Sequence, residues 1–138
     1  MKDDHPAVLA GRASQAAASG RRKQEWLDLF ADDGVVEDPV GPSGFDPEGK
    51  GHHGREEISA FYDKTIGVAE SLEFLFGDGF ACGNEVAFTG LIRTVIGGHV
   101  IDAEGVFTYK VDVAGKIVAL RAFWEVDRAM ATARPVDS

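Results

Sequence analysis

One carboxylate in this sequence lies where it could act as a general base. Asp38 belongs to the run Val35-Val36-Glu37-Asp38-Pro39-Val40, and the alternation of side chains along a strand puts Val36, Asp38 and Val40 on one face. A carboxylate among apolar neighbours resists ionisation, so its pKa rises toward the range that a general base can use. We therefore predict that Asp38 is a catalytic residue; the alternative is that it faces solvent or only caps the turn before Pro39.

The residues after Asp38 indicate where its strand stops. Pro39 has no N–H to donate to a neighbouring strand, so the strand should be an edge strand or should end there. The glycine- and proline-rich segment 41–54 predicts a long surface loop. His52 and His53 lie in this loop, but adjacent histidines point in different directions and no third ligand stands nearby. We predict no metal ion and no cofactor.

The hydrophobic periodicity changes along the chain from helical to strand-like. Residues 7–19 predict a first helix, residues 21–30 predict a second, and a third begins at Arg55. On the first helix the spacing predicts one common face, formed by Val8, Leu9, Ala13, Ala16 and Ala17. From Leu72 onward, alternating apolar residues separated by glycine-containing turns predict an antiparallel meander. Helices followed by strands indicate an α+β domain whose helices cover one face of a curved sheet.

Length and charge limit the functions that this chain can have. Its 138 residues fit one domain, residues 1–138. A formal net charge of -9 argues against nucleic-acid partners and against anionic membrane surfaces. Cys82 is the single cysteine, so no intrachain disulfide can form. Because we find neither a secretion signal nor an apolar run of transmembrane length, we expect a cytoplasmic protein.

Two further acidic residues lie in the long strand pattern near residue 105. If the strand has no bulge, Asp102 and Glu104 lie on the face opposite Phe107 and Tyr109. These acids then face solvent or a subunit interface on the outer side of the sheet. A one-residue bulge near Gly105 would reverse that assignment for the part of the strand before it.

Several segments resemble one enzyme family. LFADDGVVEDPVG (29–41) resembles the segment that carries the base in Δ5-3-ketosteroid isomerases; HGREEISAFY (53–62), AGKIV (114–118) and RAFW (121–124) resemble later segments of the same enzymes. The chain resembles still more closely the isomerase-like proteins of mycobacteria and related actinobacteria, which share GVFTY (105–109). The resemblance implies the cone-shaped nuclear transport factor 2-like fold, with three N-terminal helices packed on a curved antiparallel or mixed sheet. It also implies a homodimer formed through the outer sheet face.

The resemblance assigns roles to three residues, but two catalytic residues of the family have no match in this sequence. Asp38 matches the base, Tyr62 an auxiliary tyrosine and Trp124 a tryptophan that lines the pocket. In ketosteroid isomerase the oxyanion hole consists of a tyrosine and a neutral carboxylic acid. Ser14 stands at the position of that tyrosine and Phe107 at the position of that acid. Because each lost oxyanion donor costs on the order of 10²–10³-fold in rate, the resemblance implies a weak isomerase.

We expect an apolar pocket for a steroid-like ligand, with Ser14, Tyr62 or Trp124 as possible replacement donors. Its other predicted ligand-binding residues are apolar: Val36, Val40, Phe61, Phe88, Phe107 and Leu120. The predicted function is a steroid Δ-isomerase that moves a proton within an unsaturated 3-ketosteroid through Asp38. The alternatives are a binding protein for steroid-like molecules without turnover, and a polyketide cyclase or epoxide hydrolase of the same fold.

Overall fold

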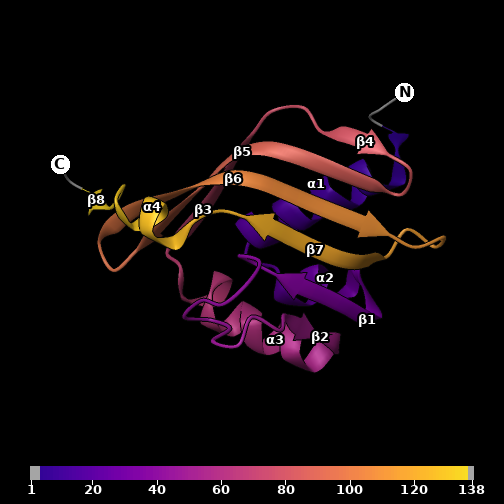
Figure 1. The fold of residues 1–138 in the computed structure, drawn as a ribbon, viewed down its shortest axis with the longest axis horizontal. Coiled ribbons are helices and arrows are strands. Elements are labelled where there is room, and N and C mark those ends of the chain that lie inside the picture. Colours follow the sequence, from indigo (N-terminus) through magenta and orange to yellow (C-terminus); the bar gives the residue numbers. More distant parts are fainter. Residues whose placement is uncertain (1–3, 137–138) are drawn as a thin grey trace.

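The computed structural model describes residues 4–136, which form helices packed on a curved, mixed sheet (Figure 1). The helical segments are α1 (Pro6–Ser19), α2 (Lys23–Asp28), α3 (Gly54–Lys64), the 3-10 helix η2 (Ile66–Val68) and α4 (Val126–Met130). The strands are β1 (Phe30–Glu37), β2 (His52–His53), β3 (Ser71–Phe76), β4 (Phe80–Cys82), β5 (Glu85–Ile96), β6 (His99–Val111), β7 (Ile117–Phe123) and β8 (Arg134–Pro135). This element order confirms the predicted α+β class.

The strands of the sheet follow the order β2-β1-β7-β6-β5-β3, with β4 paired to β5 and β8 paired to β6. The path β3-β5-β6-β7 is antiparallel throughout, as the predicted meander requires. Strand β1 instead pairs in parallel with β7. This parallel pair brings the strand that ends just before Asp38 next to the strand that leads to Trp124.

The register of β5 and β6 decides on which face of the sheet the acidic side chains of β6 lie. The two strands pair without interruption from Glu85 opposite Lys110 to Ile96 opposite His99, so no bulge occurs near Gly105. Asp102 therefore lies on the face opposite Phe107. Its carboxylate accepts a hydrogen bond of 2.9 Å from the Arg93 guanidinium across the strand pair, and this ion pair belongs to the outer face.

The helices pack on different parts of the sheet. Helix α1 packs on β3, β5 and β6, and crosses behind them in Figure 1, whereas α3 packs beside β1. The expectation of three substantial helices is wrong, because the second helix spans Lys23–Asp28 and not residues 21–30. It ends early because Leu29 O accepts the N–H of Ile117 at 2.8 Å and Phe30 already pairs with β7. None of the helices within residues 4–136 is long and apolar enough to cross a membrane.

Helix α1 approaches the sheet through a glycine. A Cβ on Gly11 would lie 2.9 Å from the rings of both Phe88 and Tyr109, so only a glycine lets the helix come this close. The predicted face of α1 is only partly right, since Val8 and Ala17 are buried but Leu9 is 55% exposed. The residues of α1 that are buried are Ala7, Val8, Ala10, Gly11, Ser14, Ala17 and Ala18.

The chain after β7 contains structure that the sequence periodicity did not predict. Helix α4 has five residues, too few for a helical repeat to stand out, and it packs on β6. Strand β8 then pairs with the start of β6, with Arg134 opposite Val100. In Figure 1 α4 and β8 lie at the same end of the sheet. Helix α4 therefore begins at Val126, two residues after Trp124.

Replacing Gly105 by alanine tests how closely β6 and the end of β7 must approach. A Cβ at Gly105 would overlap the backbone carbonyl oxygen of Phe123 and lie 3.1 Å from Trp124 Cβ. We expect Gly105→Ala to lower the free energy of unfolding by about 1–3 kcal/mol, because backbone atoms must move to admit the methyl group. Gly77→Ala is the matched control, since a Cβ there meets nothing within 4 Å. Equal stability of the two variants in urea denaturation would contradict this packing.

Candidate functional site

Asp38 lies directly after β1, at the point where the chain leaves the sheet. Val36, two residues before it, is fully buried and pairs with Leu120 of β7. Asp38 itself is half-buried, and the following Pro39 is buried. The Val40 N–H then donates to the carbonyl of Ala122 at 2.9 Å, so the backbone stays against β7 beyond the proline. The alternative that Asp38 faces bulk solvent is therefore wrong.

One side chain holds the Asp38 carboxylate in place. Trp124 Nε1 donates a hydrogen bond of 2.6 Å to Asp38 Oδ1, and within residues 4–136 this carboxylate has no other hydrogen-bond partner. Burial raises the pKa of the Asp38 carboxyl above its usual range, and the Trp124 hydrogen bond opposes that rise. The second carboxylate oxygen remains available, so the arrangement can accept a proton.

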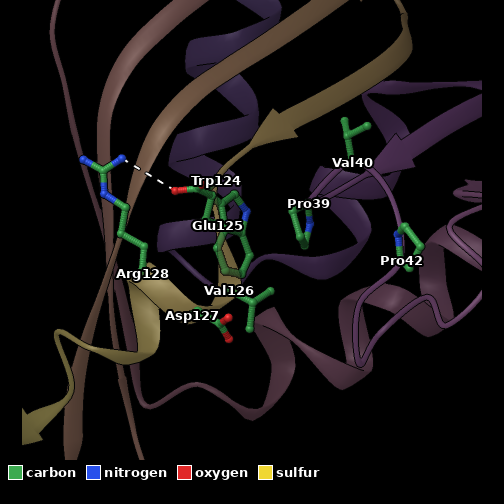
Figure 2. Close-up of a pocket in the computed structure, with 8 residues that line it drawn as sticks. All are labelled: Pro39, Val40, Pro42, Trp124, Glu125, Val126, Asp127 and Arg128. Atoms are coloured by element: carbon green, nitrogen blue, oxygen red, sulfur yellow. Dashed lines mark ion pairs between the residues drawn. The ribbon is translucent and has the colours of Figure 1, made fainter.

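An open hollow with a volume of about 580 Å³ is lined by Trp124, the indole member of this pair (Figure 2). Its apolar side is formed by the loop after Asp38, and its charged side by the start of α4. The lining residues are Pro39, Val40, Pro42, Trp124, Glu125, Val126, Asp127 and Arg128. The α4 side was missed by the sequence analysis, because its helix was not predicted. The hollow thus borders the indole that holds Asp38 with both apolar and charged side chains.

Most of the predicted apolar ligand-binding residues belong to the interior rather than to this hollow. Of that set, Val40 and Trp124 line it. Phe107 is buried and stacks on Phe76 with ring centroids 4.6 Å apart. The remaining buried members of the set share the main hydrophobic core: Val36, Phe61, Tyr62, Phe88 and Leu120. The predicted ligand-binding residues are thus divided between the interior and the open hollow.

The two aromatic residues predicted on α3 lie in different surroundings from Asp38. The Tyr62 ring packs against Trp26 at 5.5 Å between centroids, and the Lys23 ammonium lies over it. Phe61 packs against His52 at 4.8 Å. Phe61 and His52 also line a second, smaller hollow of about 240 Å³. The contacts of Tyr62 therefore do not place it beside the Asp38 carboxylate.

The histidines of the loop have protein partners. His53 Nε2 lies 2.7 Å from the carbonyl oxygen of Lys50, and His52 pairs with Val36 as part of the short strand β2. Burial lowers the pKa of His52. Within residues 4–136 no group of three or more histidine, cysteine, aspartate or glutamate side chains is arranged to hold a metal ion.

Ser14 lies inside the molecule, next to a tyrosine that the sequence analysis did not assign to the site. Ser14 is 3% exposed, and its Oγ accepts a hydrogen bond of 3.1 Å from Trp26 Nε1. Burial and the charge of Asp38 raise the pKa of Tyr109 to about 12, while the side chains of Gln15 and Ser14 oppose that rise. The available signal was the alternation that puts Tyr109 on the inward face of β6 with Phe107.

A comparison of this sequence with models of known protein families shows which family it belongs to. The model for the SnoaL-like domain matches residues 12–120. The chain belongs to the SnoaL-like domain family. The resemblance drawn from sequence segments is thereby confirmed at the level of family and fold.

Solved structures of similar proteins agree with this family. This SnoaL-like domain is 35% identical to Δ5-3-ketosteroid isomerase from Mycobacterium sp., with a TM-score of 0.84 over 94% of this chain and 98% of that one. It is 31% identical to Rv0760c from Mycobacterium tuberculosis in complex with estradiol-17β-hemisuccinate, with a TM-score of 0.85 over 95% and 99% of the two chains. A computationally designed 17-OHP binder is 29% identical, with a TM-score of 0.83 over 97% and 98%.

The raised pKa of Asp38 predicts a pH-dependent cost to stability. Because the folded chain binds the Asp38 proton more tightly than the unfolded chain, the free energy of unfolding falls as the pH rises from the unfolded pKa through the folded pKa. We expect Asp38→Asn to raise Tm at pH 7, since the amide is uncharged and still accepts the Trp124 hydrogen bond. The gain should shrink below about pH 4, where both states of the wild type become protonated.

Thermal unfolding between about pH 3 and 8 measures this difference. Asp33→Asn serves as the control, because Asp33 is exposed on β1 and its replacement should leave Tm unchanged. A lower Tm for Asp38→Asn at pH 7 would show that the charged carboxylate stabilises the fold, contrary to this account.

Proposed function

We propose that this SnoaL-like domain is a steroid-type isomerase that binds an unsaturated 3-ketosteroid beside Asp38. The single observation that supports it best is a half-buried carboxylate with a raised pKa, held by one indole N–H and left with one oxygen unbonded. A base in such surroundings is matched to removing a weakly acidic C–H proton near neutral pH. The steroid complex of Rv0760c and the designed 17-OHP binder support the ligand class.

In the proposed reaction Asp38 carries one proton from one carbon of the steroid to another. The carboxylate removes a proton from the carbon next to the ketone. The C–H electron pair forms a double bond to the carbonyl carbon while the carbonyl π pair moves onto the oxygen, which gives an enolate. The same carboxyl group then returns the proton to a different carbon, so the double bond moves and Asp38 is regenerated. The Trp124 N–H fixes the orientation of the carboxylate during both transfers.

A second function, steroid binding without turnover, is favoured by the residues at the two oxyanion positions. Ser14 already accepts the indole hydrogen bond of Trp26, and Phe107 is stacked on Phe76. Neither is the tyrosine or the carboxylic acid on which ketosteroid isomerase relies. Hydrolysis is less well supported, because within residues 4–136 Asp38 has only Trp124 as a hydrogen-bond partner and does not belong to a hydrogen-bonded cluster that would hold a water molecule.

Asp38→Asn tests the base assignment. The variant keeps the shape of the side chain and an acceptor for Trp124, but its amide cannot take the proton. We expect the rate of isomerisation of an unsaturated 3-ketosteroid to fall by about 10²–10⁴-fold, while steroid affinity stays within a few-fold of wild type. The conversion is followed by the ultraviolet absorbance of the conjugated enone.

Glu37→Gln is the matched control, because the neighbouring Glu37 carboxylate forms an ion pair with Arg121, with 2.9 Å between Oε1 and Nε. It should retain the wild-type rate. If Asp38→Asn turns over substrate at the wild-type rate, Asp38 is not the base. If the wild-type protein binds the steroid without converting it, the second function is established.

We also propose that the chain forms a homodimer through the outer face of the sheet. Three large apolar side chains on β3, β6 and β7 are exposed there, namely Leu75, Val106 and Phe123. Val106 and Phe123 are direct cross-strand partners, so they form one continuous apolar surface. On the opposite face of β3, Phe74 and Phe76 pack inward.

Phe123→Asp tests this assembly. A charge in the middle of a self-complementary apolar interface is repeated on both subunits, so we expect the variant to sediment as a monomer at concentrations where the wild type is dimeric. Val113→Asp is the control, because Val113 is fully exposed in the turn between β6 and β7. A monomeric wild type in sedimentation velocity would exclude the proposed dimer.

A further inference from the structure

Trp124 and Glu125 are the two residues between β7 and α4, so the place of the Trp124 indole depends on both elements. On the β7 side the chain lies close against β6, because a Cβ on Gly105 would lie 3.1 Å from Trp124 Cβ. Phe123, the last residue of β7, also pairs with Val106 of β6. The anchor on the other side of Trp124 must come from the residues that follow it.

Residues 126–136, which we call the C-terminal strap, continue along β6 where β7 ends. Strand β7 pairs with residues 106–111 of β6, and β8 pairs with residues 99–100. Residues 101–105 lie between these two stretches, so the backbone groups on that edge need other partners. Helix α4 packs on β6, and Ala129 is its buried residue.

One hydroxyl group joins α4 to this edge of β6. Thr132 Oγ1 accepts the backbone N–H of Asp102 at 2.8 Å and donates to the carbonyl oxygen of Ala129 at 2.7 Å; the Asp102 carbonyl oxygen lies farther away, at 3.4 Å. The same oxygen atom therefore satisfies a donor of the edge strand and an acceptor at the C-terminal end of the helix. A serine can form both bonds, whereas a valine, which has nearly the same shape as threonine, can form neither.

The side chain of Asp102 holds the strap a second time. Its carboxylate is 14% exposed and accepts two hydrogen bonds from Arg93, at 2.9 and 3.2 Å. It also forms an ion pair with Arg134 of the strap at 3.3 Å. Arg134 Nη1 in turn donates to the carbonyl oxygen of Thr132 at 3.1 Å. Asp102 thus meets the strap through its backbone N–H and through its carboxylate, and charge-assisted bonds of the second kind are the stronger ones.

We propose that Thr132 and Asp102 are positioning residues that fix the C-terminal strap and, through it, the Trp124 indole that orients the Asp38 carboxylate. Both anchors of Trp124 then belong to β6, with the close contact at Gly105 on one side and Asp102 on the other. Because one strand carries both anchors, the indole N–H stays 2.6 Å from Asp38 Oδ1. An effect on turnover rests on the proposed function, whereas the effect on the indole requires no ligand.

Hydrogen exchange of the two tryptophan indoles tests this role in the free protein. Thr132→Val removes the hydroxyl, so we expect the Trp124 indole N–H to exchange about 3- to 10-fold faster, as the loss of one hydrogen bond allows. The Trp26 indole, bonded to Ser14, is the internal reference and should keep its rate. Thr132→Ser should restore the wild-type exchange. Proton–nitrogen correlation spectra resolve the two indole signals, and Trp124→Phe assigns them.

Thr65→Val is the matched control, because the Thr65 hydroxyl donates to the carbonyl oxygen of Phe61 in α3 at 2.8 Å. It should leave exchange at Trp124 unchanged. Asp102→Asn keeps the backbone N–H but loses the charge; it should also accelerate exchange at Trp124 alone, and it provides the reading if Thr132→Val does not fold. Equal acceleration of both indoles, or no change at Trp124, overturns the proposal.

Turnover measurements distinguish this proposal from the proposed function. In an active protein, Thr132→Val should lower kcat for the unsaturated 3-ketosteroid by about 3- to 10-fold, and Thr132→Ser should recover it. If Asp38→Asn abolishes turnover but Thr132→Val leaves Trp124 exchange unchanged, the base stands and the positioning role is wrong. If the wild type shows no turnover but Thr132→Val accelerates Trp124 exchange alone, the positioning role stands and the isomerase function is wrong.

Discussion

The hydrogen bond between the Trp124 indole and the Asp38 carboxylate is the interaction on which the candidate site depends. Withdrawing a carboxylate from water is costly, and here a single N–H offsets only part of that cost. A fully paired carboxylate would be a poor base, while an unpaired one would be free to turn toward solvent. One strong donor gives the group a fixed orientation and leaves it basic.

The geometry of this pair is set by the sheet rather than by the loop. Because β1 runs parallel to β7, the end of one strand lies beside the end of the other, and Asp38 and Trp124 are the residues that follow. The close contact of Gly11 with the rings beneath α1 sets the distance between helix and sheet, and that of Gly105 with Phe123 sets the distance between β6 and the end of β7. Small residues at these two points let large aromatic side chains fill the interior.

The sequence predicted those features that follow from local alternation and turn chemistry. The strand that ends before Pro39 and the antiparallel meander follow from turn chemistry and period-two patterns, and the structure bears them out. The length of the second helix was wrong, because pairing of Phe30 with β7 overrides helical propensity. Helix α4 was too short to give a signal. The surroundings of Tyr62, Phe107 and Tyr109 depend on contacts between distant elements, which no local pattern reports.

The parallel pairing of β1 with β7 also governs when the site can be completed during synthesis. Asp38 leaves the ribosome early, but its hydrogen-bond partner is Trp124, and β1 has no parallel neighbour until residues 117–123 have emerged. Contacts between such distant parts of a chain form late, because a long loop must close first. A nascent chain that stops short of β7 therefore carries the carboxylate without the strand and indole that orient it, and the candidate site is complete only after Trp124 has been synthesised.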